Sequence, residues 1–197
     1  MPKGIPLTED AQEQRRLEIF DASVHLFIQK GFNETSMREI AAAAGVGKST
    51  LYDYYASKED ILVSYYQGEI FKITGRAQKI ALQKLTNKEK LTRIMYMHLA
   101  YLVESKSYFW RLSMEAQRLS ADSQKKIQIY RHAYQDLLKQ IVAEGIQAGE
   151  FRAIDPFIAS RSLLSLLTIA AFTTRPTGTP EQMLEDILSM CFEGIQA

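Results

Sequence analysis

Apolar residues recur along the chain at the three- and four-residue spacing of amphipathic helices, and no segment alternates in the manner of an exposed strand. The first helical segment spans residues 8–30. Ser36 and Glu39 have capping-box spacing, which predicts a short second helix that closes at Gly45. A third helix is expected over residues 47–54, directly after that glycine.

Longer helices follow in the remainder of the chain. Their starts are marked by Ser57 with Asp60, Thr86 with Glu89, Ser107 or Tyr108, Ser120, Asp155 before Pro156, and Thr179 before Pro180. No proline occurs between residues 7 and 155, so this stretch is free of the strongest helix breaker. The pattern predicts an all-α chain of about nine helices.

Residues 36–54 have the parts of a helix-turn-helix, which needs a supporting helix, a glycine turn and a second helix that enters the major groove. The residues expected to join the two helices are Ile40, Ala41, Ala44, Gly45, Val46 and Leu51. The residues left for the exposed edge are Gly47, Lys48, Ser49, Thr50, Tyr52 and Tyr54. These groups suit phosphate oxygens and base edges, and Arg38 has the geometry to contact a guanine.

The first third of the chain resembles the TetR family of transcription regulators. The similarity runs from Ile19 to Leu62 and includes IFDASVHLF, GF at 31–32, TSMREIA at 35–41 and AGVGKSTLYDYYASKEDIL at 44–62. The resemblance implies a DNA-binding domain over residues 1–58 and an effector-binding and dimerisation domain over residues 59–197. It implies contacts to phosphate or backbone from Thr35, Ser36, Lys48, Tyr54 and Lys58, and base reading by Arg38, Ser49, Thr50 and Tyr52.

Charge restricts how such a chain binds DNA. The whole protein has 24 basic and 23 acidic residues, and the first sixty residues have seven basic and ten acidic ones, a net charge of −3. DNA contact must therefore come from a local face instead of a broadly basic surface. The alternative for Arg38 and Lys48 is a plain solvated surface. Asp53 either caps locally or pairs with Lys48 or Lys58.

The last two helices are candidates for a dimer interface. The helix over residues 156–172 is apolar around most of its circumference, which predicts burial on both sides. Packing of this helix and the last one against their symmetry mates would form a four-helix seam, as the family resemblance also implies. The predicted interface residues are Leu163, Leu167, Leu184, Ile187, Leu188 and Cys191. A dimer is required because two recognition helices must meet successive major grooves about 34–36 Å apart.

The middle helices are rich in aromatic residues, and the resemblance implies that they enclose an effector. The predicted effector-binding residues are His98, Tyr101, Trp110, Met114, Gln117, Tyr134 and Phe172. The alternative is that aromatic residues at helical spacing form an ordinary core. If the pocket exists, its mixture of rings and polar groups suits a moderately apolar organic molecule.

Enzymatic functions find little support in the sequence. GVGKST resembles a phosphate-binding loop, but its first glycine position is Ala42 and helical alanines precede it. No metal-ligand spacing, catalytic pair or cofactor motif is present, so no enzyme, metal or cofactor is expected. The N-terminal segment has no signal peptide pattern and no apolar run is long enough to span a membrane, which together with the single Cys191 predicts a cytoplasmic protein.

The predicted partners are therefore double-stranded operator DNA, a small organic effector and a second copy of the chain. The favoured function is a repressor released from a palindromic operator by that effector. The alternative is an effector-independent regulator or activator whose core is filled.

Overall fold

The computed structural model describes residues 8–195, except for the side chains at 107–111 and 194–195. These described residues form nine helices and no strand, which confirms the predicted all-α fold. The helices are α1 (Glu9–Lys30), α2 (Met37–Ala43), α3 (Lys48–Tyr54), α4 (Lys58–Ala81), α5 (Asn87–Glu104), α6 (Lys106–Ala116), α7 (Ala121–Gln147), α8 (Pro156–Phe172) and α9 (Pro180–Ile195).

Side chains just outside the helices hold their first turns, as the sequence predicts. Thr8 Oγ1 accepts a hydrogen bond from the Ala11 amide at 3.3 Å, and Asp155 Oδ1 accepts one from the Phe157 amide at 2.8 Å. These contacts satisfy amides that have no partner within the helix, which fixes where each helix begins. One start differs from expectation, because α6 begins at Lys106, before the predicted Ser107 or Tyr108.

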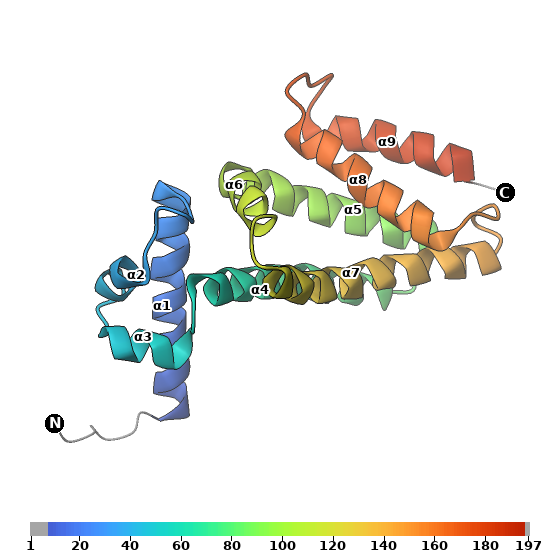
Figure 1. Cartoon of the computed structure of the whole chain (residues 1–197). Coiled ribbons are helices and arrows are strands. Elements are labelled where there is room, and N and C mark those ends of the chain that lie inside the picture. The colour runs from blue at the N-terminus through green and yellow to red at the C-terminus, as the bar shows by residue number, and fades with distance from the viewer. Residues whose placement is uncertain (1–7, 196–197) are drawn as a thin grey trace. The chain divides into compact units, whose positions relative to one another are not determined.

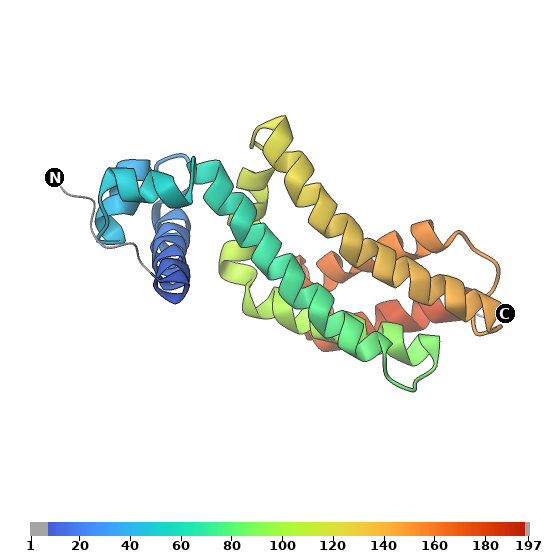
Figure 2. The same cartoon turned by 90° about the horizontal axis from the view of Figure 1, so that it is seen from below.

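The chain divides into two compact units. The first contains the residues up to Gln67 together with Trp110–Ile127, and the second contains Gly68–Phe109 and Gln128–Ala197. The division does not coincide with a single cut after residue 58. Three helices, α4, α6 and α7, pass without a break from one unit into the other, and Figure 2 shows α4 and α7 as continuous helices.

In the first unit, α2 packs against both α1 and α3, as Figure 1 shows. The contact is made by completely buried apolar side chains, among them Phe27 of α1, Ile40 of α2 and Leu51 of α3. The Phe27 ring also lies 5.1 Å from the ring of Phe32, which follows α1. This core holds the two short helices in place, because neither has enough hydrogen bonds to be stable alone.

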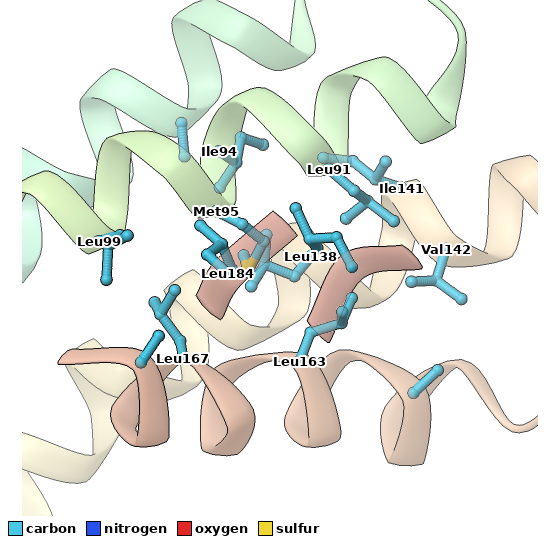
Figure 3. Close-up of a cluster of buried hydrophobic side chains, with 14 of the residues drawn as sticks. Leu91, Ile94, Met95, Leu99, Leu138, Ile141, Val142, Leu163, Leu167 and Leu184 are labelled. Carbon is cyan, nitrogen blue, oxygen red and sulfur yellow. The ribbon is translucent and has the colours of Figure 1, made fainter. Parts of the chain in front are cut away.

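The second unit has an apolar core to which α5, α7, α8 and α9 contribute. Figure 3 shows Leu91, Ile94, Met95 and Leu99 from α5, Leu138, Ile141 and Val142 from α7, Leu163 and Leu167 from α8, and Leu184 from α9. Each of these side chains is at most 4% exposed.

This core corrects four of the predicted dimer contacts. Leu163, Leu167, Leu184 and Leu188 are already covered by the chain's own helices, with exposures of 0–4%, so they have no surface left for a second copy. The sequence pattern reveals that α8 and α9 are apolar, but it does not reveal which neighbour covers each side. The two remaining predicted contacts, Ile187 and Cys191, are half-buried.

The turn between α7 and α8 is tied to the start of α5. Glu150 accepts a hydrogen bond from Asn87 Nδ2 and another from the Lys88 amide, both at 3.0 Å. The neighbouring Phe151 is 2% exposed, and its ring lies parallel to that of Phe192 with 6.1 Å between centroids. The turn that joins α7 to α8 is therefore held against both α5 and α9 at one end of the core.

Two further properties concern the described residues as a whole. Within 8–195, no helix combines the length and the apolarity needed to cross a membrane. In the same range, no group of three or more His, Cys, Asp and Glu side chains is arranged to hold a metal ion.

Candidate functional site

The turn between α2 and α3 has the geometry of a helix-turn-helix. Gly45 has a φ of +64°, a left-handed conformation that glycine adopts without the steric cost of a side chain. The Val46 amide donates to the Ala41 carbonyl at 2.9 Å, which closes the turn. Because Ile40 and Leu51 are both completely buried, the two helices keep one fixed relative orientation.

The start of α2 is held by a capping box and by an ion pair. Ser36 Oγ accepts from the Glu39 amide at 3.3 Å, and Glu39 accepts from the Ser36 amide at 2.8 Å. Lys30, at the end of α1, pairs with the same carboxylate. Hydrogen bonds from Lys30 and Ser36 lower the pKa of Glu39 from 4.5 to about 2. The carboxylate is thus charged at neutral pH and joins α1 to α2.

Most residues predicted to contact DNA lie on accessible surface. Ser36, Arg38, Gly47, Lys48, Ser49 and Tyr52 are exposed, and Thr50 and Tyr54 are half-buried. The Lys48 ammonium lies 5.9 Å from the centre of the Tyr52 ring, one turn along α3. The exposed edge of α3 thus combines a cation, a hydroxyl and an aromatic ring, groups that can bind phosphate oxygens and base edges.

Two of the predicted phosphate contacts have structural roles instead. The Lys58 ammonium donates to the carbonyl oxygens of Phe32, Asn33 and Thr35 at 2.9, 3.1 and 3.2 Å. An ammonium has three N–H donors, so this lysine is fully engaged in tying α4 to the loop after α1. Thr35 is 1% exposed and its hydroxyl donates to the Gly31 carbonyl at 2.7 Å.

Asp53 is exposed on α3. Among the described residues it forms no ion pair with Lys48 or Lys58, the two lysines that the sequence offered as partners. Its charge therefore faces solvent near the predicted DNA contacts, where it repels phosphate groups.

Three of the predicted effector residues lie together in the second unit. Tyr134 Oη is 3.1 Å from His98 Nδ1, and the two rings meet edge to face at 5.4 Å. The ring of Tyr101 lies 6.3 Å from that of His98. Burial lowers the pKa of His98 to about 4, so the imidazole is neutral at pH 7. Burial likewise raises the pKa of Tyr134. The result is a neutral polar pair within an apolar core.

The other four predicted effector residues lie elsewhere in the sequence of helices. Met114 and Gln117 are exposed and belong to the first unit, whereas Phe172 is half-buried against the core of the second. The side chain of Trp110 lies outside the described residues. Of the seven residues predicted from the sequence, His98, Tyr101 and Tyr134 are the three that the recorded side-chain contacts bring together.

A hollow of about 230 Å³ borders one member of the predicted set, Tyr101. It is lined by Glu69, Lys72, Ile73, Arg76, Tyr101, Glu104 and Ser105. Sequence reasoning missed Lys72 and Arg76. Their four-residue spacing places them on one face of a helix, but spacing alone does not show that Tyr101 faces them.

Comparison with known proteins gives two family matches along the chain. Residues 19–65 match the model for bacterial regulatory proteins of the tetR family. Residues 84–195, more than half of the chain, match the model for the tetracycline repressor-like C-terminal domain.

Individual relatives agree with these matches. The chain is 29% identical over 136 residues to a fatty acid metabolism regulator protein of Bacillus subtilis, covering 69% of this chain and 70% of that one. It is 25% identical over 185 residues to the transcriptional repressor KstR2 of Rhodococcus jostii, covering 92% and 91%. Among solved structures, the regulator FadR of Bacillus subtilis in complex with stearoyl-CoA superposes with a TM-score of 0.78 at 25% identity, covering 91% and 99%.

Proposed function

The chain belongs to the tetR family of bacterial regulatory proteins, and on this premise we propose that it is a homodimer that leaves a palindromic operator when it binds an acyl-coenzyme A thioester. The protein is a DNA-binding transcription regulator with a helix-turn-helix and a tetracycline repressor-like C-terminal domain. A regulator of this kind acts where the chromosome lies, so we assign it to the bacterial cytoplasm.

The assignment of the DNA contacts rests on the difference between the buried and the exposed side of α3. Leu51 is completely buried against α2, whereas Lys48, Ser49 and Tyr52 are exposed. This is the arrangement that a recognition helix needs, with one side fixed to the protein and the other free to enter a groove.

The DNA contacts can be tested after the operator is selected from random duplexes. Tyr52→Ala and Lys48→Ala are expected to weaken binding to the selected duplex by about tenfold or more, measured by fluorescence anisotropy. Lys48→Ala should also reduce the slope of log affinity against log salt by about 1. Both variants should remain dimers in analytical ultracentrifugation.

Lys84→Ala is the matched control, because Lys84 is an exposed lysine between α4 and α5, in the second unit. It should bind the duplex as the wild type does. An equal loss of affinity in Lys84→Ala would refute the assignment of these contacts to α3.

We propose that a second copy of the chain packs against the outer face of α8 and α9. Ile158 and Ile169 of α8 are 55% and 50% exposed, and Met190 of α9 is 59% exposed. Large apolar side chains in this number on adjacent helices are typical of an interface. A depression of about 370 Å³ on α8, lined in part by Ile158 and Leu166, offers a place for a side chain of the partner.

The acyl-coenzyme A effector is suggested by the relatives and is compatible with the second unit. The solved FadR structure contains stearoyl-CoA, and one relative is a regulator of fatty acid metabolism. An acyl thioester needs apolar surroundings for its chain, a hydrogen bond for its carbonyl and cations for its phosphates. The hollow beside Tyr101 contains the cations Lys72, which is paired with Glu69, and Arg76, and the His98–Tyr134 pair can bond to a carbonyl. The acyl chain would have to displace side chains of the apolar core, which the chain's own helices fill.

Release of the operator requires the effector to prefer the form that does not bind DNA. A hundredfold preference corresponds to about 2.7 kcal/mol. Thermal shift with stearoyl-CoA should raise Tm, and the same compound should dissociate the operator complex. Stearate alone and coenzyme A alone are the controls and should each have a smaller effect.

The effector-independent regulator is the second candidate. It is favoured by one observation, that Tyr134 Oη and His98 Nδ1 already bond to each other and that neither residue lines the hollow beside Tyr101. Failure of stearoyl-CoA and of a wider panel of small organic compounds to raise Tm would support this candidate.

A further inference from the structure

The first turn of α4 carries two neighbouring charges whose side chains bind different parts of the first unit. Lys58 donates to three carbonyls of the loop between α1 and α2, as described above. Glu59 instead accepts hydrogen bonds from Ser120 and Ser123, which lie just before and in the first turn of α7. One helical turn thus contacts both the loop between α1 and α2 and the start of α7.

The carboxylate of Glu59 is densely bonded. Its Oε2 atom accepts from Ser120 Oγ at 2.6 Å and from Ser123 Oγ at 2.7 Å, and the Ser120 amide lies 3.2 and 3.3 Å from its two oxygens. Hydrogen bonds to an ionised acceptor are stronger than neutral ones, and these hold the pKa of Glu59 below its ordinary value. Ser123 is only 5% exposed, Glu59 is half-buried and Ser120 is exposed, so the contact is partly open to water.

The position of this contact at the start of α7 strengthens it further. An unsatisfied backbone amide and the positive end of the helix dipole both favour a carboxylate there. Ser120 also caps α7 from the other side, since its Oγ accepts from the Ser123 amide at 3.4 Å and its carbonyl accepts from the Gln124 amide at 2.9 Å. The start of α7 is therefore fixed to the first turn of α4.

The rest of α7 belongs to the second unit. The helix is continuous from Ala121 to Gln147 and leaves the first unit after Ile127. Farther along the same helix, Tyr134 bonds to His98, and Leu138 and Ile141 are buried in the core. A displacement or rotation of α7 in the second unit must be accommodated at its N-terminus, because a helix transmits motion along its axis much better than a loop does.

We propose that the contact of Glu59 with Ser120 and Ser123 couples effector binding in the second unit to the DNA-binding helices, with Glu59 as a positioning residue. The motion passes from α7 through the carboxylate to the first turn of α4, and from there through Lys58 to the loop before α2. A second, longer hydrogen bond also holds this loop: Asn33 donates to Glu115 of α6 at 3.4 Å. The proposal rests on effector control as put forward under the proposed function, but not on the identity of the effector.

The discriminating variant is Glu59→Gln, which keeps the size of the side chain and removes its charge. A neutral amide oxygen cannot accept as strongly from two hydroxyls and a backbone amide, so the contact loosens. Glu13→Gln is the matched control, since Glu13 is an exposed carboxylate of α1 in the same unit, outside the loop that Lys58 binds, and its replacement changes the net charge equally. Any electrostatic effect of the lost charge on DNA affinity should be common to both variants.

The first measurement needs no effector. Hydrogen exchange of the peptide over residues 118–127 is followed in the full-length dimer with and without the selected operator duplex. Coupling is reciprocal, so operator binding should slow exchange at the start of α7 by about threefold or more in the wild type and in Glu13→Gln. In Glu59→Gln the slowing should disappear, although the variant still binds the duplex.

The second measurement uses stearoyl-CoA. It should weaken operator binding by about 100-fold in the wild type and by about tenfold or less in Glu59→Gln, with similar affinity for stearoyl-CoA itself. Ser123→Ala should reduce the coupling as well, and the double variant should lose no more than Glu59→Gln alone. If stearoyl-CoA does not bind the wild type, the acyl-coenzyme A proposal fails and the exchange measurement alone decides the coupling. A Glu59→Gln protein with an unchanged exchange response would overturn the coupling role.

Discussion

Gly145, near the end of α7, tests whether the turn that connects α7 to α8 is as tightly packed as the structure indicates. A methyl group at this position would lie 2.3 Å from Cε2 and 2.4 Å from Cδ2 of Phe151, and 3.2 Å from Cβ of Asn87. Carbon atoms in contact are separated by about 3.5 Å or more, so the ring would have to move by about 1 Å. We therefore expect Gly145→Ala to destabilise the protein.

The expected change in the free energy of unfolding combines a gain from alanine in a helix with losses from overpacking and from displacement of the Phe151 ring. Replacing glycine by alanine within a helix stabilises by about 1 kcal/mol, and overpacking a buried site costs about 1–3 kcal/mol. Phe151 is 2% exposed and stacked on Phe192, and its neighbour Glu150 is bonded to the start of α5, so the ring has little freedom to shift. Partial expulsion of the ring adds a share of the about 3–5 kcal/mol that a lost phenylalanine costs. The net destabilisation should be about 2 kcal/mol.

For a chain of this length, such a change lowers Tm by about 4–8 °C. Thermal and urea unfolding followed by circular dichroism would measure it. Gly75→Ala is the matched control, because Gly75 lies inside α4 and a Cβ there meets no heavy atom within 4 Å. That variant should be more stable than the wild type by about 0.5–1 kcal/mol. A Gly145→Ala protein stabilised to the same degree as Gly75→Ala would refute the packing argument.

Three further predictions concern charges and exposed surface. Lys58→Met should lower the free energy of unfolding by about 1–3 kcal/mol, because it leaves carbonyls without their donor. Lys48→Met should change the free energy of unfolding by less than about 0.5 kcal/mol but weaken operator binding. Urea unfolding of both variants shows which lysine is structural. Because the pKa of Glu39 is depressed, its charge stabilises the fold above pH 4.5, and this contribution is lost as the pH falls toward about 2. In Glu39→Gln the free energy of unfolding should therefore fall less steeply with decreasing pH. Unfolding at a series of pH values would show this. Ile169→Asp should convert the dimer to monomers in analytical ultracentrifugation. Leu82→Asp, at an 87% exposed position outside α8 and α9, should remain a dimer. A dimeric Ile169→Asp protein would contradict the proposed interface.

The helices and the DNA-binding motif could be predicted from the sequence because they depend on local interactions. Capping pairs such as Ser36 with Glu39 and Thr86 with Glu89 are three residues apart, so their spacing alone marks a helix start, and both capping boxes are present. The turn glycine at 45 and the buried Ile40 and Leu51 are separated by few residues as well. Short-range geometry leaves these side chains little choice of neighbour.

The functional assignment of single side chains needed the tertiary structure. Lys58 lies in a motif that suggests a phosphate contact, yet its ammonium is bound to carbonyls 23 to 26 residues earlier in the chain. Glu59 acquires its role only because Ser120 and Ser123, 61 and 64 residues away, are folded against it. Leu163 and Leu184 are apolar in the sequence in the same way as Ile158 and Met190, but α5 and α7 cover the first two and leave the others exposed.

The physical reason is the range of the interactions involved. Helical periodicity, capping and turn conformation arise between residues within a few positions of one another, so the amino-acid sequence by itself determined the all-α class, the helix starts and the helix-turn-helix of this protein. Burial and the choice of hydrogen-bond partner arise between segments brought together by packing. Only the tertiary structure decided which lysine is free to meet DNA, which apolar face of α8 is open, and which carboxylate joins α4 to α7.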